Sequence, residues 1–179
     1  MSCKVLARGF RPIPRAIHPS PSRPASDLFR LVPATADWVE ADFEAVMASR
    51  TAIRGLFGPE VDWPPSDLTI QEDRDDLQWH ANEFEAGTSF AFLVTATRER
   101  LCNGCLYLFP TQSPDHDIEA YLWIRSDLDN AISKPIEEQI IAWVNQAWPF
   151  RHVAWPGRDC PIVDWSRRGY ANYYSRLRD

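Results

Sequence analysis

The spacing of apolar and polar residues along the chain predicts an ordered series of strands and helices. The stretch LFRLVPA at residues 28–34 predicts a short strand, and Thr35 is placed to cap a helix whose apolar positions follow helical spacing. Thr69 and Glu72 form the pattern of a capping box, which predicts a second helix that ends before Gly87. Two helices therefore precede the main strands.

Three apolar stretches predict the centre of a sheet. SFAFLVTA at residues 89–96 and CLYLFP at 105–110 are continuously apolar, which is typical of strands buried on both faces. DIEAYLWIR at 117–125 alternates instead, with its even positions apolar and its odd positions running from Glu119 to Arg125. We expect the even face to pack and the odd face to meet a ligand.

A third helix and a further strand follow. Ser133 is predicted to cap the helix, Pro135 lies in its expected first turn, and Pro149 ends it. RHVAWP at 151–156 predicts a strand that is parallel to the previous one, because a helix connects the two. DWSRRGYANYYSRL at 164–177 predicts one helical turn and a last extended piece.

The first 27 residues differ in composition from the rest. RGFRPIPRAIHPSPSRPAS contains five prolines and no apolar period, which predicts a poorly ordered extension ahead of a single domain at 28–179. This arm is a candidate for covering a cleft or for forming a homodimer.

The net charge of the chain limits the classes of partner that it is expected to bind. The net charge is −6, but residues 1–26 hold five basic residues and no acid, so the remainder has 14 basic against 25 acidic residues and a net charge of −11. Such a body repels nucleic acids and anionic membranes and favours cationic partners such as amines. The chain has no run of eighteen apolar residues and no apolar segment near its start, so we expect a cytoplasmic protein without a membrane span.

The sequence predicts no metal site. Four cysteines without a secretory signal favour reduced thiols. Cys102 and Cys105 form a single CxxC pair, whereas a structural zinc site usually needs two pairs. His80 and Glu83 lie one helical turn apart, but two ligands alone are weak evidence, and a helix-packed histidine is the simpler interpretation.

The order of these elements, with the stretches CNGCLYLFP, EAYLWIR, ISKPIEEQIIAWV and DWSRRGY, resembles the GNAT family of acyl-CoA N-acyltransferases from about residue 28 to the end. The resemblance implies an α/β (α+β) fold with a mixed, mostly antiparallel sheet. It also implies a V-shaped splay between the fourth and fifth strands, with helices on both faces.

The resemblance also implies acetyl-CoA as co-substrate. The family's Arg-x-x-Gly-x-Gly loop, which holds the diphosphate, falls near Leu128–Lys134, where Asp129 and Asn130 stand in place of basic and glycine residues. A diphosphate can bind there only if Asp127 and Asp129 point away from it. The cofactor-binding residues implied by the resemblance are Trp123, Ile124, Asn130, Ala131, Ser133 and Lys134.

The implied reaction is transfer of an acetyl group to a primary amine of a small molecule or peptide. Glu119 is the candidate general base, although it could instead be an edge carboxylate paired with Arg125. Trp165 stands where the family has a Tyr that acts as general acid, which leaves Tyr170 and Tyr173 as candidates. The opposing hypothesis is a catalytically silent module of the same fold that binds a ligand or partner.

Overall fold

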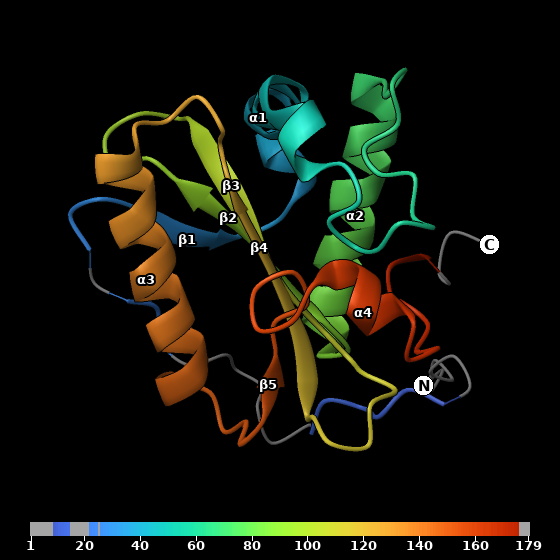
Figure 1. Ribbon diagram of the computed structural model, residues 1–179. Coiled ribbons are helices and arrows are strands. Elements are labelled where there is room, and N and C mark those ends of the chain that lie inside the picture. The colour runs from blue at the N-terminus through green and yellow to red at the C-terminus, as the bar shows by residue number, and fades with distance from the viewer. Residues whose placement is uncertain (1–8, 15–21, 25, 176–179) are drawn as a thin grey trace.

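The computed structural model describes residues 9–14, 22–24 and 26–175, which form one sheet with helices on both faces (Figure 1). The elements are β1 (Arg30–Pro33), a 3₁₀ turn (Ala36–Trp38), α1 (Val39–Ile53), α2 (Ile70–Ala86), β2 (Phe90–Thr95), β3 (Cys102–Phe109), β4 (Ile118–Ile124), α3 (Asn130–Ala147), β5 (Val153–Ala154) and α4 (Ile162–Ser166).

The five strands lie in the order β1-β2-β3-β4-β5. The first four are antiparallel to their neighbours, and β5 is parallel to β4, as the connecting helix required. The predicted mixed sheet is thus confirmed. Beyond Ala154 the described residues add no further strand, so the extended piece expected near the end of the chain is not one of the sheet's strands.

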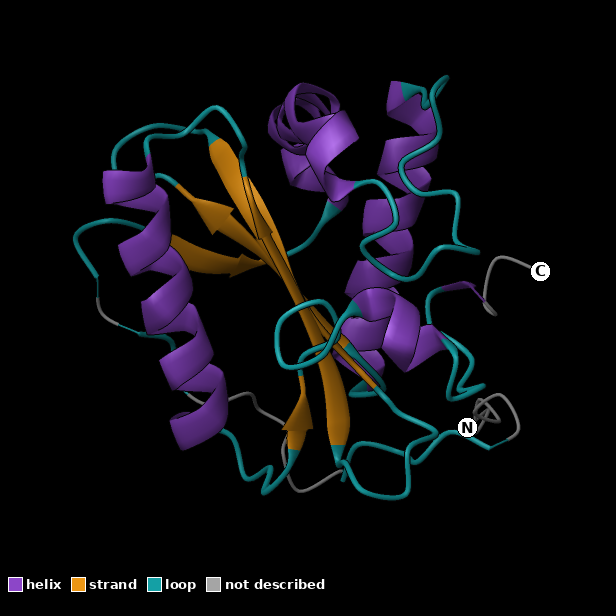
Figure 2. Ribbon diagram, in the orientation of Figure 1, coloured by secondary structure: helices purple, strands orange, loops and turns teal. Residues whose placement is uncertain are grey.

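Helices cover the two faces of the sheet separately. Figures 1 and 2 show α1 and α2 on one side and α3 on the other. Since side chains alternate along a strand, β4 sends Tyr121 and Trp123 into the core under α1 and α2 and Ile118, Ala120 and Leu122 into the core under α3. Both faces of β4 are therefore packed.

The capping box predicted for the second helix is present. The Thr69 hydroxyl accepts from the Glu72 N–H at 3.2 Å, and the Glu72 carboxylate accepts from the Thr69 N–H at 2.8 Å. Gly87 ends the helix with φ +67°, a left-handed conformation that favours glycine. Thr35 precedes the 3₁₀ turn, but its side chain makes no capping hydrogen bond.

Part of the N-terminal arm belongs to the core, contrary to the prediction. Phe10 is 7% exposed and packs edge-on against Tyr173, and Ile13 is 3% exposed in the core under α3. The Arg11 N–H donates to the Thr111 carbonyl at 3.0 Å. Prolines prevent regular structure here, but they do not prevent single apolar side chains from docking. Residues 1–8, 15–21 and 25 of the predicted extension lie outside the described residues.

None of the helices in the described ranges combines the length and apolar character needed to cross a bilayer.

Candidate active site

The fourth and fifth strands part after two residue pairs. Ile118 faces Val153 and Glu119 faces Ala154, whereas β4 continues to Ile124. Pro156 has no N–H to continue the pairing, and Gly157 turns the chain away with φ +87°. The predicted splay is therefore present, and it leaves one edge of β4 without a strand partner.

Glu119 lies at the point where the strands part, and it is 1% exposed. The Thr111 hydroxyl donates to Oε1 at 2.7 Å, and the Tyr121 hydroxyl donates to Oε2 at 2.7 Å. Burial raises the pKa of Glu119, while hydrogen bonds from Tyr121, Thr111 and Trp165 act in the opposite direction. The alternative pairing with Arg125 is wrong, because Arg125 binds Glu44 and Asp127 instead.

A cavity of about 220 Å³ adjoins Glu119. Its lining comes from the loop after α1, from β4, and from α4 and the segment that follows: Phe57, Glu60, Val61, Glu119, Tyr121, Trp165, Ser166, Tyr170, Ala171, Asn172 and Ser175. The Asn172 amide donates to the Tyr121 hydroxyl at 3.0 Å, so a chain of hydrogen bonds runs from Asn172 through Tyr121 to Glu119.

Two residues of this network were not predicted. Tyr121 is not one of them, because the alternation of β4 placed it with Glu119 on the face expected to meet a ligand, and the two are hydrogen-bonded. Asn172 lies between the two candidate tyrosines without any periodic signal, and Thr111 lies in a loop after β3. Only the fold brings these two to the carboxylate.

The two candidate acids are separated. Tyr170 is half-buried, lines the cavity and contacts Trp165 with ring centroids 5.6 Å apart. Tyr173 is 3% exposed and donates its hydroxyl to Glu83 of α2 at 2.8 Å. Burial and the neighbouring Glu83 carboxylate raise the pKa of Tyr173. Because Tyr173 is held in the aromatic core, the structure does not bring it to Glu119.

The N-terminus of α3 begins earlier than predicted. Asp129, not Ser133, is the N-cap, and its Oδ1 accepts from the Ala131 N–H at 2.7 Å. Ser133 lies inside the first turn, and its N–H donates to the Asp129 carbonyl at 2.9 Å. The condition for diphosphate binding, that Asp129 points away from this helix end, is therefore not met in this structure. Lys134 is exposed one turn further along.

The loop between β4 and α3 also lacks the features of an anion-binding loop. Asparagine is a residue type that tolerates a left-handed conformation, but Asn130 does not adopt one, since no described non-glycine residue has a positive φ. Arg125 is held by Glu44 and Asp127, whose carboxylates raise its pKa. The loop's one arginine is thus already neutralised by two carboxylates of the chain.

Arg158 occupies the space beside the free edge of β4. Its guanidinium donates to the Leu122 carbonyl at 3.2 Å and to Glu137 of α3 at 3.0 Å. Trp123 and Ile124 pair with Cys105 and Gly104 of β3 in a regular register, so β4 has no bulge there that would turn a backbone N–H toward a thioester carbonyl. The irregularity lies between β2 and β3 instead.

One part of this site fits coenzyme A and another part does not. The free edge of β4 offers main-chain groups that could pair with the amides of a pantetheine arm once Arg158 moves. The helix N-terminus fits a diphosphate poorly, because the Asp129 carboxylate already binds the Ala131 N–H there. Asn130 and Lys134 remain available to an anion at this helix end, whereas the Ala131 N–H is available only if the Asp129 side chain rotates away.

A second group of possible ligands lies in the core between α1, α2 and β3. The thiols of Cys102 and Cys105 donate to Asp42 Oδ1 at 3.4 and 3.3 Å. Burial raises the pKa of Asp42 to about 6, against the effect of the two thiol hydrogen bonds. Burial, and then repulsion from Asp42, raise the pKa of Asp73 to about 8.

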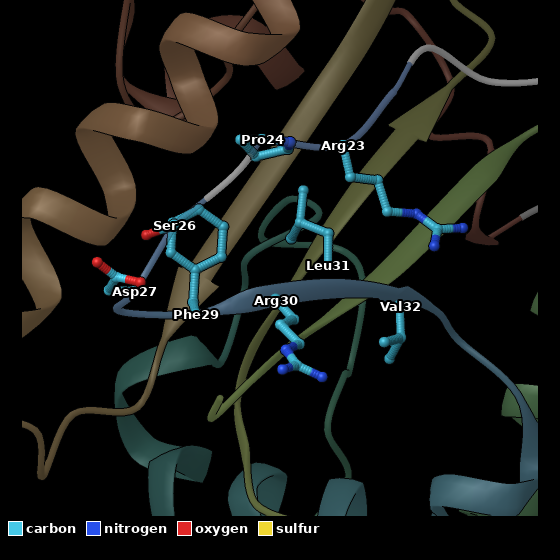
Figure 3. A pocket seen from close by; sticks show the side chains of 8 residues that line it. All are labelled: Arg23, Pro24, Ser26, Asp27, Phe29, Arg30, Leu31 and Val32. Carbon is cyan, nitrogen blue, oxygen red and sulfur yellow. The ribbon is translucent and has the colours of Figure 1, made fainter. Parts of the chain in front are cut away.

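A cleft of about 570 Å³ lies along β1 (Figure 3). Its charged lining residues are Arg23, Asp27 and Arg30. Because β1 and β5 are the two edges of the sheet, this cleft lies across the sheet from Glu119 and contains none of the predicted site residues. We do not assign it to the same site.

Comparisons with known proteins identify the fold. No protein family model and no curated protein sequence matches the chain. Among solved structures, RimL, the ribosomal L7/L12 alpha-N-protein acetyltransferase in complex with coenzyme A, matches with a TM-score of 0.51 and 15% identity over 70% of this chain and 69% of that chain. The ribosomal-protein-S5-alanine acetyltransferase of Vibrio fischeri gives a TM-score of 0.53 and 14% identity over 70% and 68%.

A Salmonella typhimurium acetyl transferase that modifies the N-terminal serine of the 50S ribosomal subunit protein L7/L12 also matches. The TM-score is 0.51 with 14% identity, over 69% of this chain and 67% of that chain. At such identities the likeness establishes the fold. The predicted resemblance to the GNAT acetyltransferases is therefore confirmed at the level of the fold.

Proposed function

We propose that this chain, which has the fold of the GNAT acetyltransferases, transfers an acetyl group from acetyl-CoA to a primary amine. The observation that carries the proposal is the buried carboxylate of Glu119 at the point where β4 and β5 part, beside a polar cavity. A carboxylate whose pKa is raised by burial is suited to accept a proton near neutral pH.

The residues around Glu119 support a direct transfer. The ammonium group of the substrate loses a proton to Glu119, either directly or through the Tyr121 hydroxyl that is bonded to it. The free amine then attacks the thioester carbonyl carbon, and the carbon–sulfur bond breaks. Tyr170, which lines the same cavity, protonates the leaving sulfur and recovers a proton from the attacking nitrogen as the amide forms. This sequence needs no covalent intermediate with the protein.

The size of the cavity favours the end of a chain over a bulky group. A volume of about 220 Å³ corresponds to roughly seven water molecules at about 30 Å³ each. Glu60 adds a carboxylate to its lining, which suits a cationic group. Because one structural neighbour modifies the N-terminal serine of L7/L12 and RimL is an alpha-N-protein acetyltransferase, we favour a peptide α-amine as the acceptor, in the cytoplasm.

A second candidate function is a catalytically silent module of the same fold. Two observations favour it: Asp129 binds the helix end where a diphosphate would lie, and Arg158 bridges β4 to α3 across the opening. Such a protein would bind a ligand or partner without transferring an acetyl group.

Calorimetric titration with acetyl-CoA separates the two candidates. Micromolar binding, followed by transfer to peptides with a free N-terminus, supports the acetyltransferase. An absence of heat at millimolar acetyl-CoA eliminates the acetyltransferase and leaves the silent module.

A further inference from the structure

We propose that Asp42, Cys102 and Cys105 bind a zinc ion that ties α1 to β3. Asp73 of α2 lies outside the group of ligand atoms that the structure holds within 4.8 Å, and it would complete the ligand set by turning toward Asp42. Asp42 lies sixty residues before Cys102 in the sequence, so a search for a second cysteine pair could not have found it. The site is separate from Glu119, and it does not depend on the proposed acetyltransferase function.

The geometry approaches that of a tetrahedral zinc site. One ligand atom from each of the three residues lies within 4.8 Å of the other two, and all three residues are buried. Zinc binds sulfur at about 2.3 Å and carboxylate oxygen at about 2.1 Å, so a tetrahedral angle separates sulfur from oxygen by roughly 3.6 Å. The observed separations from Asp42 Oδ1 are 3.4 Å for Cys102 and 3.3 Å for Cys105.

A bulge in β3 is what brings both thiols to one face. Residues three apart in a regular strand point to opposite faces. Here Thr95 faces Cys102 while Val94 faces Gly104, so Asn103 is an extra residue and the alternation shifts by one. A Cβ on Gly104 would lie 2.0 Å from the Trp123 carbonyl oxygen, so glycine is required at the bulge. The bulge therefore re-aims Cys105 toward Cys102 and Asp42.

The charges around the site lack a compensating cation. Asp42 and Asp73 are 5% and 4% exposed, and Asp73 Oδ2 is buried without a hydrogen-bond partner in the described part of the chain. No Lys or Arg among the described residues forms an ion pair with either carboxylate. A zinc ion would give the Asp73 carboxylate a partner that it lacks. Because the two positive charges of the ion replace two thiol protons, the net charge of the site stays the same.

Sulfur and carboxylate ligands in a closed, tetrahedral arrangement favour zinc over calcium or magnesium, which prefer oxygen ligands alone. Binding displaces the two thiol protons to solvent and leaves two thiolates on the metal. No oxidant or reductant is needed.

The test uses the full chain with cobalt(II) as a spectroscopic probe. The protein is unfolded with reductant and chelator and is refolded with Co²⁺. We expect one equivalent to bind with a thiolate-to-cobalt charge-transfer band, and Zn²⁺ should displace it. Cys160→Ser is the matched control, because Cys160 lies outside the cluster, and it should leave the band unchanged.

The variants at the site should behave differently from that control. Cys102→Ser and Cys105→Ser should abolish the two-thiolate band, and Asp73→Asn should weaken binding by roughly tenfold to a hundredfold. Unchanged affinity in Asp73→Asn would remove that residue from the ligand set.

The wild-type chain alone also tests whether zinc binds, even if the variants do not fold. Protein purified without chelator should contain about one zinc per chain, and its melting temperature should fall when the zinc is removed. The proposal is overturned if refolding with Co²⁺ gives no thiolate band, or if added zinc leaves the melting temperature unchanged.

Discussion

Replacing Asp129 by Ser tests whether this carboxylate opposes the diphosphate of coenzyme A. Asp129 is exposed at the N-terminus of α3, and its Oδ1 accepts from the Ala131 N–H at 2.7 Å. Serine is also a good N-cap, so the variant removes the charge and keeps the helix end satisfied. We therefore expect the affinity for acetyl-CoA to rise without a loss of stability.

The size of the effect follows from Coulomb's law. Two unit charges about 4 Å apart repel by about 1 kcal/mol in water and about 4 kcal/mol at a surface-like dielectric. These limits correspond to a change of roughly fivefold to roughly a thousandfold in affinity. Because Asp129 is exposed, the lower part of this range applies, and we expect an increase of about tenfold that shrinks as salt is added.

Calorimetry with two ligands isolates the diphosphate. Acetyl-CoA should bind Asp129→Ser more tightly than it binds wild type, whereas S-acetylpantetheine, which has no phosphate, should bind both equally. Asp75→Ser is the matched control, because it removes one exposed carboxylate from α2 on the other face of the sheet. Equal gains for both ligands, or a gain as large in Asp75→Ser, would refute this account of Asp129.

Three further predictions concern the cavity and the buried carboxylates. Glu119→Gln should lower turnover by about a hundredfold, and unchanged turnover would remove Glu119 from the mechanism. Tyr170→Phe should lower turnover, whereas Tyr173→Phe should lower only the free energy of unfolding, by about 1 kcal/mol; a kinetic defect confined to Tyr173→Phe would reverse this assignment. The raised pKa of Asp73, about 8 against 3.8, makes the folded state bind a proton that the unfolded state releases. In metal-free protein the contribution of Asp73 to the free energy of unfolding should therefore be fully present below pH 4 and be lost, by on the order of 3–5 kcal/mol, as the pH rises to 8. Denaturant titrations should show this slope in wild type and a shallower one in Asp73→Asn, and equal slopes would contradict it.

The order of elements was predictable because it depends on local patterns. The capping box at Thr69 and the parallel direction of β5 follow from residue types and from one topological rule, and both are present. The start of α3 was mispredicted because Pro135 suggested a first turn with Ser133 before it. The helix instead begins at Asn130 and accommodates the proline in its interior.

The candidate site was less predictable, because it depends on contacts between distant segments. Nothing in the local sequence distinguishes Tyr170, which lines the cavity, from Tyr173, whose hydroxyl reaches Glu83 ninety residues away. The two cysteines at 102 and 105 likewise would lie on opposite faces without the bulge at Asn103. Alternation along β4, by contrast, correctly grouped Glu119 with Tyr121 on one face.

The acceptor side of the splay between β4 and β5 supports acetyl transfer, whereas the cofactor side opposes it. On the acceptor side, Glu119 and Tyr121 form a hydrogen-bonded pair beside a cavity suited to an amine. On the cofactor side, Asp129 and Arg158 already bind the main-chain N–H and carbonyl groups that a diphosphate and a pantetheine arm would use. Both contacts involve side chains that can rotate away, whereas the position of Glu119 is fixed by the sheet and two short hydrogen bonds. The cofactor side can therefore change by rotation of two side chains, whereas the acceptor side cannot. For this reason the affinity for acetyl-CoA, rather than the geometry of the acceptor cavity, decides whether the chain is an enzyme.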